Sequence, residues 1–345
     1  AALLVRPFSA YLTDAFSRKP IYLFSYFLFV LIFISYPIVT SINVFILMRI
    51  LHGFAFGSVT TTGNTLIVDI MPPSRRGEGL GYFGTANNLA MSIGPMIGLF
   101  LLDSTANYNL IFYIAIISGT IGFICASMIR CKKKITVVKE KISLDRFYLS
   151  KGLLSGISLL LLGMPYGMTM TYTPIYGKEL GALEGLGGFF SLLAIGMIAS
   201  RLFSGKLVDR GKLLYVISIG SFICFLTFLF YASLKYILLF TPLGILPYLF
   251  YAVALALGIG YGMMFPAYNA LFVNLAPSHR RATASSTYLT SWDVGVGLGL
   301  VLGGSLADMG GSLALSFLVG SISALLSFIL FKKWAGPHYD KHKLI

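Results

Sequence analysis

Long uninterrupted runs of apolar residues are the feature that most limits how this chain can fold. Such runs recur along the sequence, for example at 21–39, 153–169 and 213–234. Each is close to the ~20 residues that an α-helix needs to cross the hydrocarbon layer of a membrane. The runs are too long for barrel strands and have no period of two, and a helix satisfies its own backbone hydrogen bonds in lipid. They therefore predict an all-α, polytopic membrane protein.

Charge and cysteine content agree with a membrane location. Only 11% of the 345 residues are charged, against ~25% in an average soluble domain. The net charge of +14 would suggest nucleic acid in a soluble protein, but here the basic residues fall in short connections between the apolar runs. Three cysteines are an odd number and imply no disulfide framework. We therefore expect the lipid bilayer, and no nucleic acid, as a partner.

The breaks between the runs predict eleven helical segments and their orientation. The connections alternate between basic and nearly uncharged, and the positive-inside rule places the basic set in the cytoplasm of a multi-pass inner-membrane protein. The cytoplasmic set comprises the connections near 18–19, 75–76, 131–149, 206–212 and 279–281 and the C-terminus. The segments are a fragment ending near Leu12 and then 20–39, 43–69, 77–102, 109–130, 150–176, 185–205, 213–234, 246–275, 281–307 and 312–332.

The two halves of the chain repeat one another. The stretch 6–14 matches 201–209 at Arg, Phe, Ser, Leu and Asp, and further Gly, Asn, Pro and Arg residues match later in each half. Parallel repeats within one membrane chain are typical of transporters. The offset also predicts that the first span and part of the second precede residue 1, giving twelve spans in all. We expect an N-terminal bundle at 1–130, a cytoplasmic connection at 131–149, a C-terminal bundle at 150–333 and a cytoplasmic tail at 334–345.

The motif at 10–19, and its repeat at 205–212, resembles a signature of the major facilitator superfamily, Gly-x-x-x-Asp-Arg-x-Gly-Arg-Arg/Lys, which lies between spans 2 and 3. The first copy departs from it at Ala10, Ala15 and Ser17. The resemblance implies two pseudo-symmetric six-helix bundles that transport by alternating access, and we expect a monomer. A carboxylate at the cytoplasmic end can accept hydrogen bonds from a helix N-terminus and close the inner side. The gating residues predicted in this way are Arg6, Asp14, Arg18, Lys19, Asp69, Arg201, Gly205, Asp209 and Arg210.

Three ionisable residues fall at membrane depth and are candidates for proton coupling. Arg49 and His52 belong to the stretch 49–53, which resembles the family's span-4 signature Arg-x-x-Gln-Gly. Asp293 lies about 18 Å along its helix from Arg281, close to the middle of the bilayer. Such residues are usually functional. Alternatively, Arg49 extends to the outer surface, His52 is a packed imidazole, and Asp293 stabilises a glycine-rich helix by hydrogen bonding.

The stretch 90–98 resembles the family's span-5 antiporter signature, Gly-x-x-x-Gly-Pro-x-x-Gly, with Ala90 in place of the first glycine. The matching residues Gly94, Pro95 and Gly98 suit close helix packing and a bend. The association of this signature with exporters is implied by the resemblance. Simple packing of helices is the alternative explanation of the spacing.

Aromatic and polar residues predict a substrate cavity, because aromatic surfaces with a few polar groups suit amphipathic organic solutes. Aromatic packing between helices is the alternative for each of them. The candidates are Asn64, Tyr166, Thr169, Tyr172, Tyr261, Tyr268, Asn269 and Trp292.

The favoured function is export of drug-like compounds or metabolites in exchange for protons, as the resemblance to drug:proton antiporters implies. The proton gradient is the energy source, and we expect no cofactor, no metal and no enzymatic activity. Proton-coupled uptake of a nutrient such as a sugar is the second hypothesis. A membrane receptor or enzyme is the third, and the sequence contains no metal cluster, nucleophile elbow or phosphate loop that supports it.

Overall fold

The computed structural model describes residues 1–131, 144–181 and 187–344. All regular structure within these ranges is helical. Nine of the helical segments found there are long and apolar enough to cross a membrane. The prediction of an all-α polytopic membrane protein is therefore confirmed.

Residue contacts divide the chain into two compact units that do not follow chain order. Unit 1 comprises 1–71, 93–150 and 276–287, and unit 2 comprises 72–92, 151–275 and 288–345. Two helices, α4 (Arg76–Thr105) and α10 (Arg281–Gly310), therefore begin in one unit and end in the other. The domain boundaries expected from the sequence stay a prediction.

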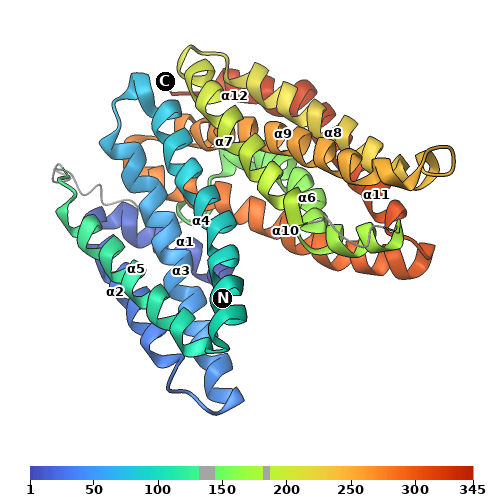
Figure 1. Cartoon of the computed structure of the whole chain (residues 1–345). Coiled ribbons are helices and arrows are strands. Elements are labelled where there is room, and N and C mark those ends of the chain that lie inside the picture. Colours follow the sequence, from blue (N-terminus) through green and yellow to red (C-terminus); the bar gives the residue numbers. More distant parts are fainter. Residues whose placement is uncertain (132–143, 182–186, 345) are drawn as a thin grey trace. The chain divides into compact units, whose positions relative to one another are not determined.

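The described residues of unit 1 form four complete long helices. Helix α3 packs against α1 and α2, and α5 packs against α2. Gly57 makes the approach of α1 to α3 possible, because a Cβ atom at this position would lie 2.6 Å from the carbonyl oxygen of Ala2. These helices are α1 (Ala2–Ala15), α2 (Arg18–Ser35), α3 (Ile42–Ile70) and α5 (Tyr108–Met128), shown in Figure 1.

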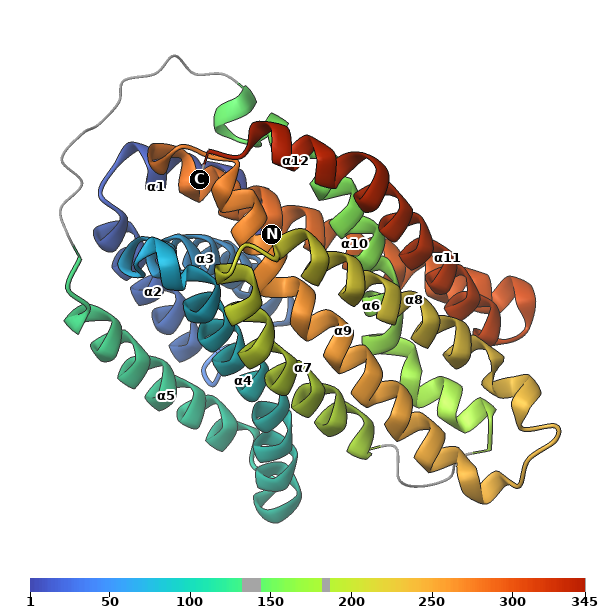
Figure 2. The same ribbon diagram turned by 90° about the horizontal axis from the view of Figure 1, so that it is seen from above.

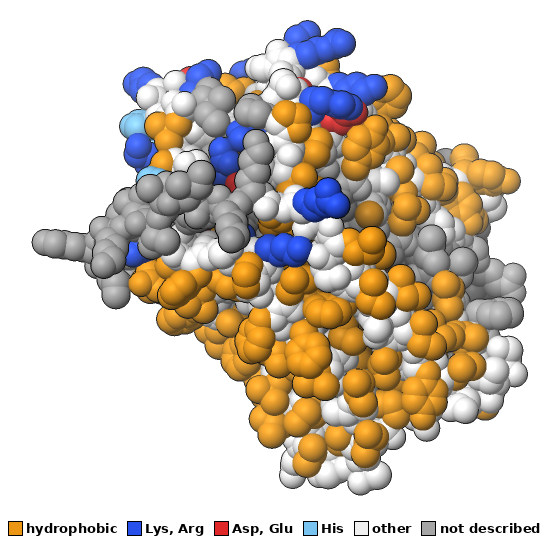
Figure 3. Space-filling model, turned by 90° about the vertical axis from the view of Figure 1, so that its left-hand side faces the viewer, with side chains coloured by type: hydrophobic (Ala, Val, Ile, Leu, Met, Phe, Trp, Pro, Cys, Tyr) orange, Lys and Arg blue, Asp and Glu red, His pale blue; other side chains and the backbone are white. Residues whose placement is uncertain are grey.

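Helices α2 and α5 expose large apolar side chains, including Phe24, Leu31, Ile117 and Ile121. Figure 3 shows such a surface, with a broad area of hydrophobic side chains and with Lys and Arg side chains gathered towards one end. Soluble monomers rarely expose contiguous apolar areas of this kind. The exposed side chains are those that a bilayer would cover.

Within the part of unit 2 that the structure describes there are five long helices and a short one. Helix α9 packs against α7 and α8, while α11 packs against α6 and α8 (Figure 2). Glycines bring α7 and α9 together, because a Cβ atom on Gly258 would lie 2.3 Å from the carbonyl oxygen of Leu193. The helices are α6 (Leu153–Glu179), α7 (Gly187–Asp209), α8 (Leu213–Ile237), α9 (Leu246–Asn274), α11 (Leu313–Leu330) and α12 (Gly336–His342).

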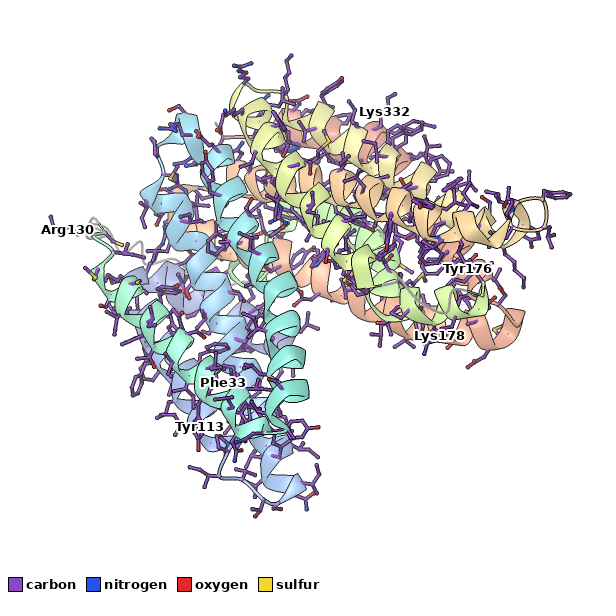
Figure 4. The ribbon with its side chains drawn as sticks, viewed as in Figure 1. Phe33, Tyr113, Arg130, Tyr176, Lys178 and Lys332 are labelled. Atoms are coloured by element: carbon purple, nitrogen blue, oxygen red, sulfur yellow. The ribbon has the colours of Figure 1, made fainter. Side chains whose placement is uncertain are left out.

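The interior of unit 2 contains a cluster of buried aromatic rings near the end of α6. Tyr176, labelled in Figure 4, packs against Tyr231 and Phe317 with ring centroids 5.3 and 5.1 Å away. Its hydroxyl donates to the carbonyl oxygen of Tyr231 at 3.3 Å. The cluster fixes the ends of α6 and α8 and the start of α11 against one another.

The C-terminal residues fold back onto unit 2. Helix α11, near whose end Lys332 lies (Figure 4), continues as the π-helical turn η6 (Phe331–Ala335) and then as α12. The backbone N–H of Leu344 donates to the carbonyl oxygen of Asn274 at 2.9 Å. The Asn274 amide donates to the Tyr339 hydroxyl at 3.0 Å. Most of the expected tail is therefore a short helix that contacts the end of α9.

The internal repeat is visible in the secondary structure. Helices α3 and α9 each have 29 residues, and α4 and α10 each have 30. A short 3-10 turn separates the members of each pair, η1 (Pro73–Arg75) in the first half and η5 (Ser278–Arg280) in the second. The 3-10 turn η4 (Leu243–Ile245) lies within the stretch that connects α8 to α9.

Candidate functional site

Asp14, at the end of α1, binds the first turn of α10. Its carboxylate accepts from the backbone N–H groups of Ala282 at 3.0 Å and Thr283 at 2.8 Å. The Thr283 hydroxyl donates to the same carboxylate at 2.8 Å. The first N–H groups of a helix have no partner within the helix, so a buried carboxylate there satisfies them and suits the helix dipole. Asp14 thus joins two helices that are far apart in sequence.

A second acidic residue of unit 1, Asp69 at the end of α3, lies between two guanidinium groups. Arg18 forms an ion pair with it, and Arg281 donates to it at 2.9 Å. Arg18 also donates to the carbonyl oxygen of Ser278 at 2.7 Å and lies 3.7 Å from Asp14. The start of α10 is therefore held by a network of charges from α1, α2 and α3.

Asp209 makes the corresponding contact in unit 2. Its carboxylate accepts from the backbone N–H groups of Gly77 at 2.7 Å and Glu78 at 3.0 Å, in the first turn of α4. Gly205 allows α7 to approach, because a Cβ atom on it would lie 2.7 Å from the carbonyl oxygen of Gly77. Both aspartates of the repeated motif therefore bind the start of a 30-residue helix.

The other predicted gating residues are distributed around these contacts. Arg6 is buried on α1, Arg210 is exposed, and Lys19 donates to the carbonyl oxygen of Ser127 at 2.7 Å. Sequence reasoning missed Arg281 and Thr283. The pair of arginines at the start of α4 and the matching pair at the start of α10 were the available signal for Arg281.

Asp145 and Arg280 form a further ion pair in unit 1. Asp145 also accepts from the hydroxyl and the backbone N–H of Ser150, at 2.6 and 2.9 Å. Partial burial acts to raise the pKa of this carboxyl, but the hydrogen bonds from Ser150 and the charge of Arg280 outweigh it. The pKa of Asp145 therefore lies below its usual value.

This shift predicts how the segment around Asp145 responds to acid. A lowered pKa gives a contribution to stability that is present above the ordinary carboxyl pKa of about 3.9 and is lost as the pH falls through the lowered value. A spin label at Tyr148 should thus stay immobile at pH 5 and become mobile only well below pH 4. In the Asp145→Asn variant the label should be mobile both at pH 5 and well below pH 4. Mobility that rises between pH 7 and 5 in the unsubstituted protein would contradict this assignment.

His52 lies in the packing between α2 and α3. Its Nδ1 atom is 2.6 Å from the Tyr36 hydroxyl, and its ring lies between Phe29 and Phe33, each with centroids 4.4 Å away (Figure 4 labels Phe33). This geometry matches the alternative of a packed, hydrogen-bonded imidazole. Arg49, one turn earlier on α3, is exposed, and Asn64, further along α3, is buried.

Asp293 is partly exposed on α10, and the glycines around it separate two faces of that helix. A Cβ atom on Gly295 or Gly299 would lie about 2 Å from a backbone oxygen of α6. Among the residues that the structure describes, none lies within 4 Å of a Cβ atom on Gly297. Residues four apart share a helix face, so Asp293 lies on the face of Gly297. The carboxylate is therefore not on the face that packs against α6.

The span-5 motif has a different environment from its repeat. Ala90 is exposed, and no described atom lies within 4 Å of a Cβ atom placed on Gly94 or Gly98. The equivalent glycine of the repeat, Gly299, packs on α6. The side chain of Pro95 lies outside the described residues.

Three of the predicted cavity residues come together in unit 2. Tyr166 packs against Tyr261 and Trp292, with ring centroids 5.0 and 4.9 Å away. The ring centroid of Phe265, a residue not predicted from the sequence, lies 4.6 Å from that of Trp292. The guanidinium carbon of Arg201 lies 5.0 Å from the ring centroid of Phe265. We call these five residues the aromatic cluster.

The remaining cavity candidates of unit 2 lie outside the cluster. The hydroxyl of Tyr268 lies 2.7 Å from that of Ser158, and Tyr172 donates to the carbonyl oxygen of Leu300 at 2.7 Å. Thr169 donates to the carbonyl oxygen of Pro165 within its own helix, and Asn269 is buried. A groove of about 800 Å³ between α8, α11 and α12 includes none of the predicted site residues, and a hollow of about 530 Å³ includes Asp209.

Comparison with known proteins gives the family. The family model described as Major Facilitator Superfamily matches residues 1–246 and 236–344. The chain belongs to the Major Facilitator Superfamily. It is a membrane transporter of small molecules and not an enzyme.

The relatives of this superfamily member include exporters. It is 22% identical over 318 residues to the staphylopine export protein of Staphylococcus aureus, with 86% of this chain and 76% of that protein covered. It is 23% identical over 347 residues to the quinolone resistance protein NorA of the same species, with 96% and 84% covered. Among solved structures, the human organic anion transporter MFSD10 matches with a TM-score of 0.79 at 16% identity, covering 96% of this chain and 80% of that one. The last likeness shows the fold alone.

Proposed function

We propose that the protein is a proton-coupled exporter of small organic molecules, drug-like compounds or metabolites, that works by alternating access. It acts as a monomer in the cell membrane, with the proton gradient as its energy source and no cofactor. The loops near 18–19, 75–76, 131–149, 206–212 and 279–281 and the C-terminus face the cytoplasm. Two relatives whose names refer to export and to quinolone resistance support this direction of transport.

The pair of aspartate contacts is the observation that carries this mechanism. Asp14 binds the start of α10 and Asp209 binds the start of α4, so each half of the sequence holds a helix of the other half. Both contacts lie at helix ends next to basic loops, which the positive-inside rule assigns to the cytoplasm. They must break for the cytoplasmic side to open, so they act as a gate with two equivalent parts.

Transport assays in proteoliposomes test this function. The purified protein is reconstituted, a pH gradient is imposed, and candidate solutes are screened for counterflow. We expect drug-like compounds or amphipathic metabolites to cross the membrane in the direction opposite to that of the protons. Movement of a sugar together with protons, and of no other class, would support an uptake symporter. The absence of any gradient-driven movement across the panel would argue against secondary transport of these classes.

The orientation of the protein gives a separate prediction. Lys178, at the end of α6 (Figure 4), and Lys212, before α8, are both exposed. In a background without Cys125, Cys131 and Cys224, Lys178→Cys should react with an impermeant thiol reagent in intact cells. Lys212→Cys should react only after the cells are broken. Labelling of Lys212→Cys in intact cells would contradict this orientation, because it would place Lys212 on the outer side of the membrane.

A further inference from the structure

Arg201 is a buried cation that makes no hydrogen bond through two of its nitrogens. Its side chain lies inside unit 2 and the residue is only 5% exposed. The Nε and Nη1 atoms are buried and have no hydrogen-bond partner. A guanidinium remains charged at any physiological pH, so this charge cannot be removed by loss of a proton.

The surroundings of Arg201 are aromatic and contain no acidic partner within the described residues. The guanidinium lies 5.0 Å above the ring of Phe265, and the ionisable side chains near it are Tyr166 and Tyr288. It also packs against α4 at Gly84, where a Cβ atom would lie 2.1 Å from Nη1. A side chain larger than that of glycine at this position would require the guanidinium to move.

Such an arrangement is unfavourable in the absence of a ligand. Removing a charge from water has a large free-energy cost, and a buried cation is normally paired with an anion. Contact with an aromatic face returns only a part of this cost. An anionic group of a bound molecule would supply the missing partner, and the rings beside Arg201 would cover its apolar part.

We propose that Arg201 binds the carboxylate, or another anionic group, of an aromatic or amphipathic substrate whose apolar part packs on Phe265, Trp292 and Tyr166. This inference rests on the proposed transport function and specifies its substrate class as organic anions. It gives Arg201 a role that is separate from the gate, because the Asp209 contact is made to the first turn of α4, about two helical turns along α7 from Arg201.

Binding of matched probes to the purified protein tests the proposal without a pH gradient. The chain has two tryptophans, so Trp334→Phe leaves Trp292 as the single fluorescent reporter in the cluster. The probes are aromatic carboxylates and their primary amides, which share shape and differ in charge. Calorimetry gives the dissociation constants, and quenching of Trp292 fluorescence locates the site.

We expect a carboxylate to bind about tenfold or more tightly than its amide, as one charge-assisted hydrogen bond in a buried site provides. Arg201→Gln should remove this preference and leave the amide affinity within about twofold. Arg201→Lys should retain part of the preference. Lys206→Gln, which removes an exposed cation from the same helix, is the matched control and should change neither affinity.

Gly84→Ala provides a second variant in case Arg201→Gln does not fold. The added methyl group displaces the guanidinium, so it should weaken binding of the carboxylate more than binding of the amide. The proposal is overturned if every carboxylate and amide pair binds alike, or if no probe binds, or if the preference survives in both variants. The binding assays use no pH gradient, so their results do not depend on whether transport is coupled to protons. Conversely, a protein without a preference for carboxylates over amides could still transport uncharged solutes.

Discussion

Asp293→Asn is expected to abolish transport driven by a pH gradient and to leave substrate binding and gradient-independent exchange in place. The sequence predicts that Asp293 lies near the middle of the bilayer, and in the structure it lies on the face of α10 that carries Gly297 rather than on the face packed against α6. Carboxylates at such depth commonly take part in proton transfer. The amide keeps the size of the side chain but cannot take up or release a proton. Uptake and counterflow in proteoliposomes, with and without the gradient, separate the two activities.

A matched variant on the same helix controls for this experiment. Asp308 is exposed near the other end of α10, so Asp308→Asn should retain gradient-driven transport. Yield and monodispersity must be equal in both variants, because a misfolded protein would lose exchange as well. Full gradient-driven transport by a well-folded Asp293→Asn protein would remove Asp293 from the coupling mechanism and favour its role as a structural hydrogen-bonding residue.

Asp14→Asn and Asp209→Asn should each weaken the gate and shift the protein towards conformations that open to the cytoplasm. Each carboxylate accepts from two backbone N–H groups, whereas an amide presents an oxygen on one side and N–H donors on the other. A hydrogen bond to a charged group is worth about 1.5–3 kcal/mol. Loss of one such hydrogen bond should change the ratio of the closed to the open conformation by about tenfold or more.

Spin labels placed within each unit measure this shift. Ser17 and Ser278 are exposed beside the Asp14 contact, and Ser74 and Lys212 are exposed beside the Asp209 contact. The label distances should lengthen in the variant of the same unit, and transport should slow. Glu179→Gln is the control, since Glu179 accepts from the backbone N–H of Leu313 at 2.9 Å in a similar contact at the start of another helix. Unchanged distances in both aspartate variants would reject the gate.

The helices and the repeated motif could be predicted because they depend on local sequence. Apolar runs fix where helices begin and end, and charges at those ends stand out against an apolar chain. The partners of Asp14 and Asp209 could not be read in the same way. Ala282 and Thr283 lie more than 260 residues from Asp14, and only the packing of helices brings them to it.

The aromatic cluster was predicted only in part, for a physical reason. A helix that is apolar on all sides carries no periodic signal to show which residues face a cavity. Tyr268 and Phe265 lie one turn apart on α9, yet Phe265 belongs to the cluster and Tyr268 contacts Ser158. Arg201 matched Arg6 by sequence, but its setting depends on Gly84 of another helix.

Proton movement coupled to substrate movement tests the account most directly. The protein is reconstituted in vesicles that contain a pH-sensitive dye, a pH gradient is imposed, and a substrate found by counterflow is then added. We expect the substrate to dissipate the gradient in vesicles with the unsubstituted protein and to leave it intact with Asp293→Asn. Substrate transport that proceeds without any proton movement would contradict the account.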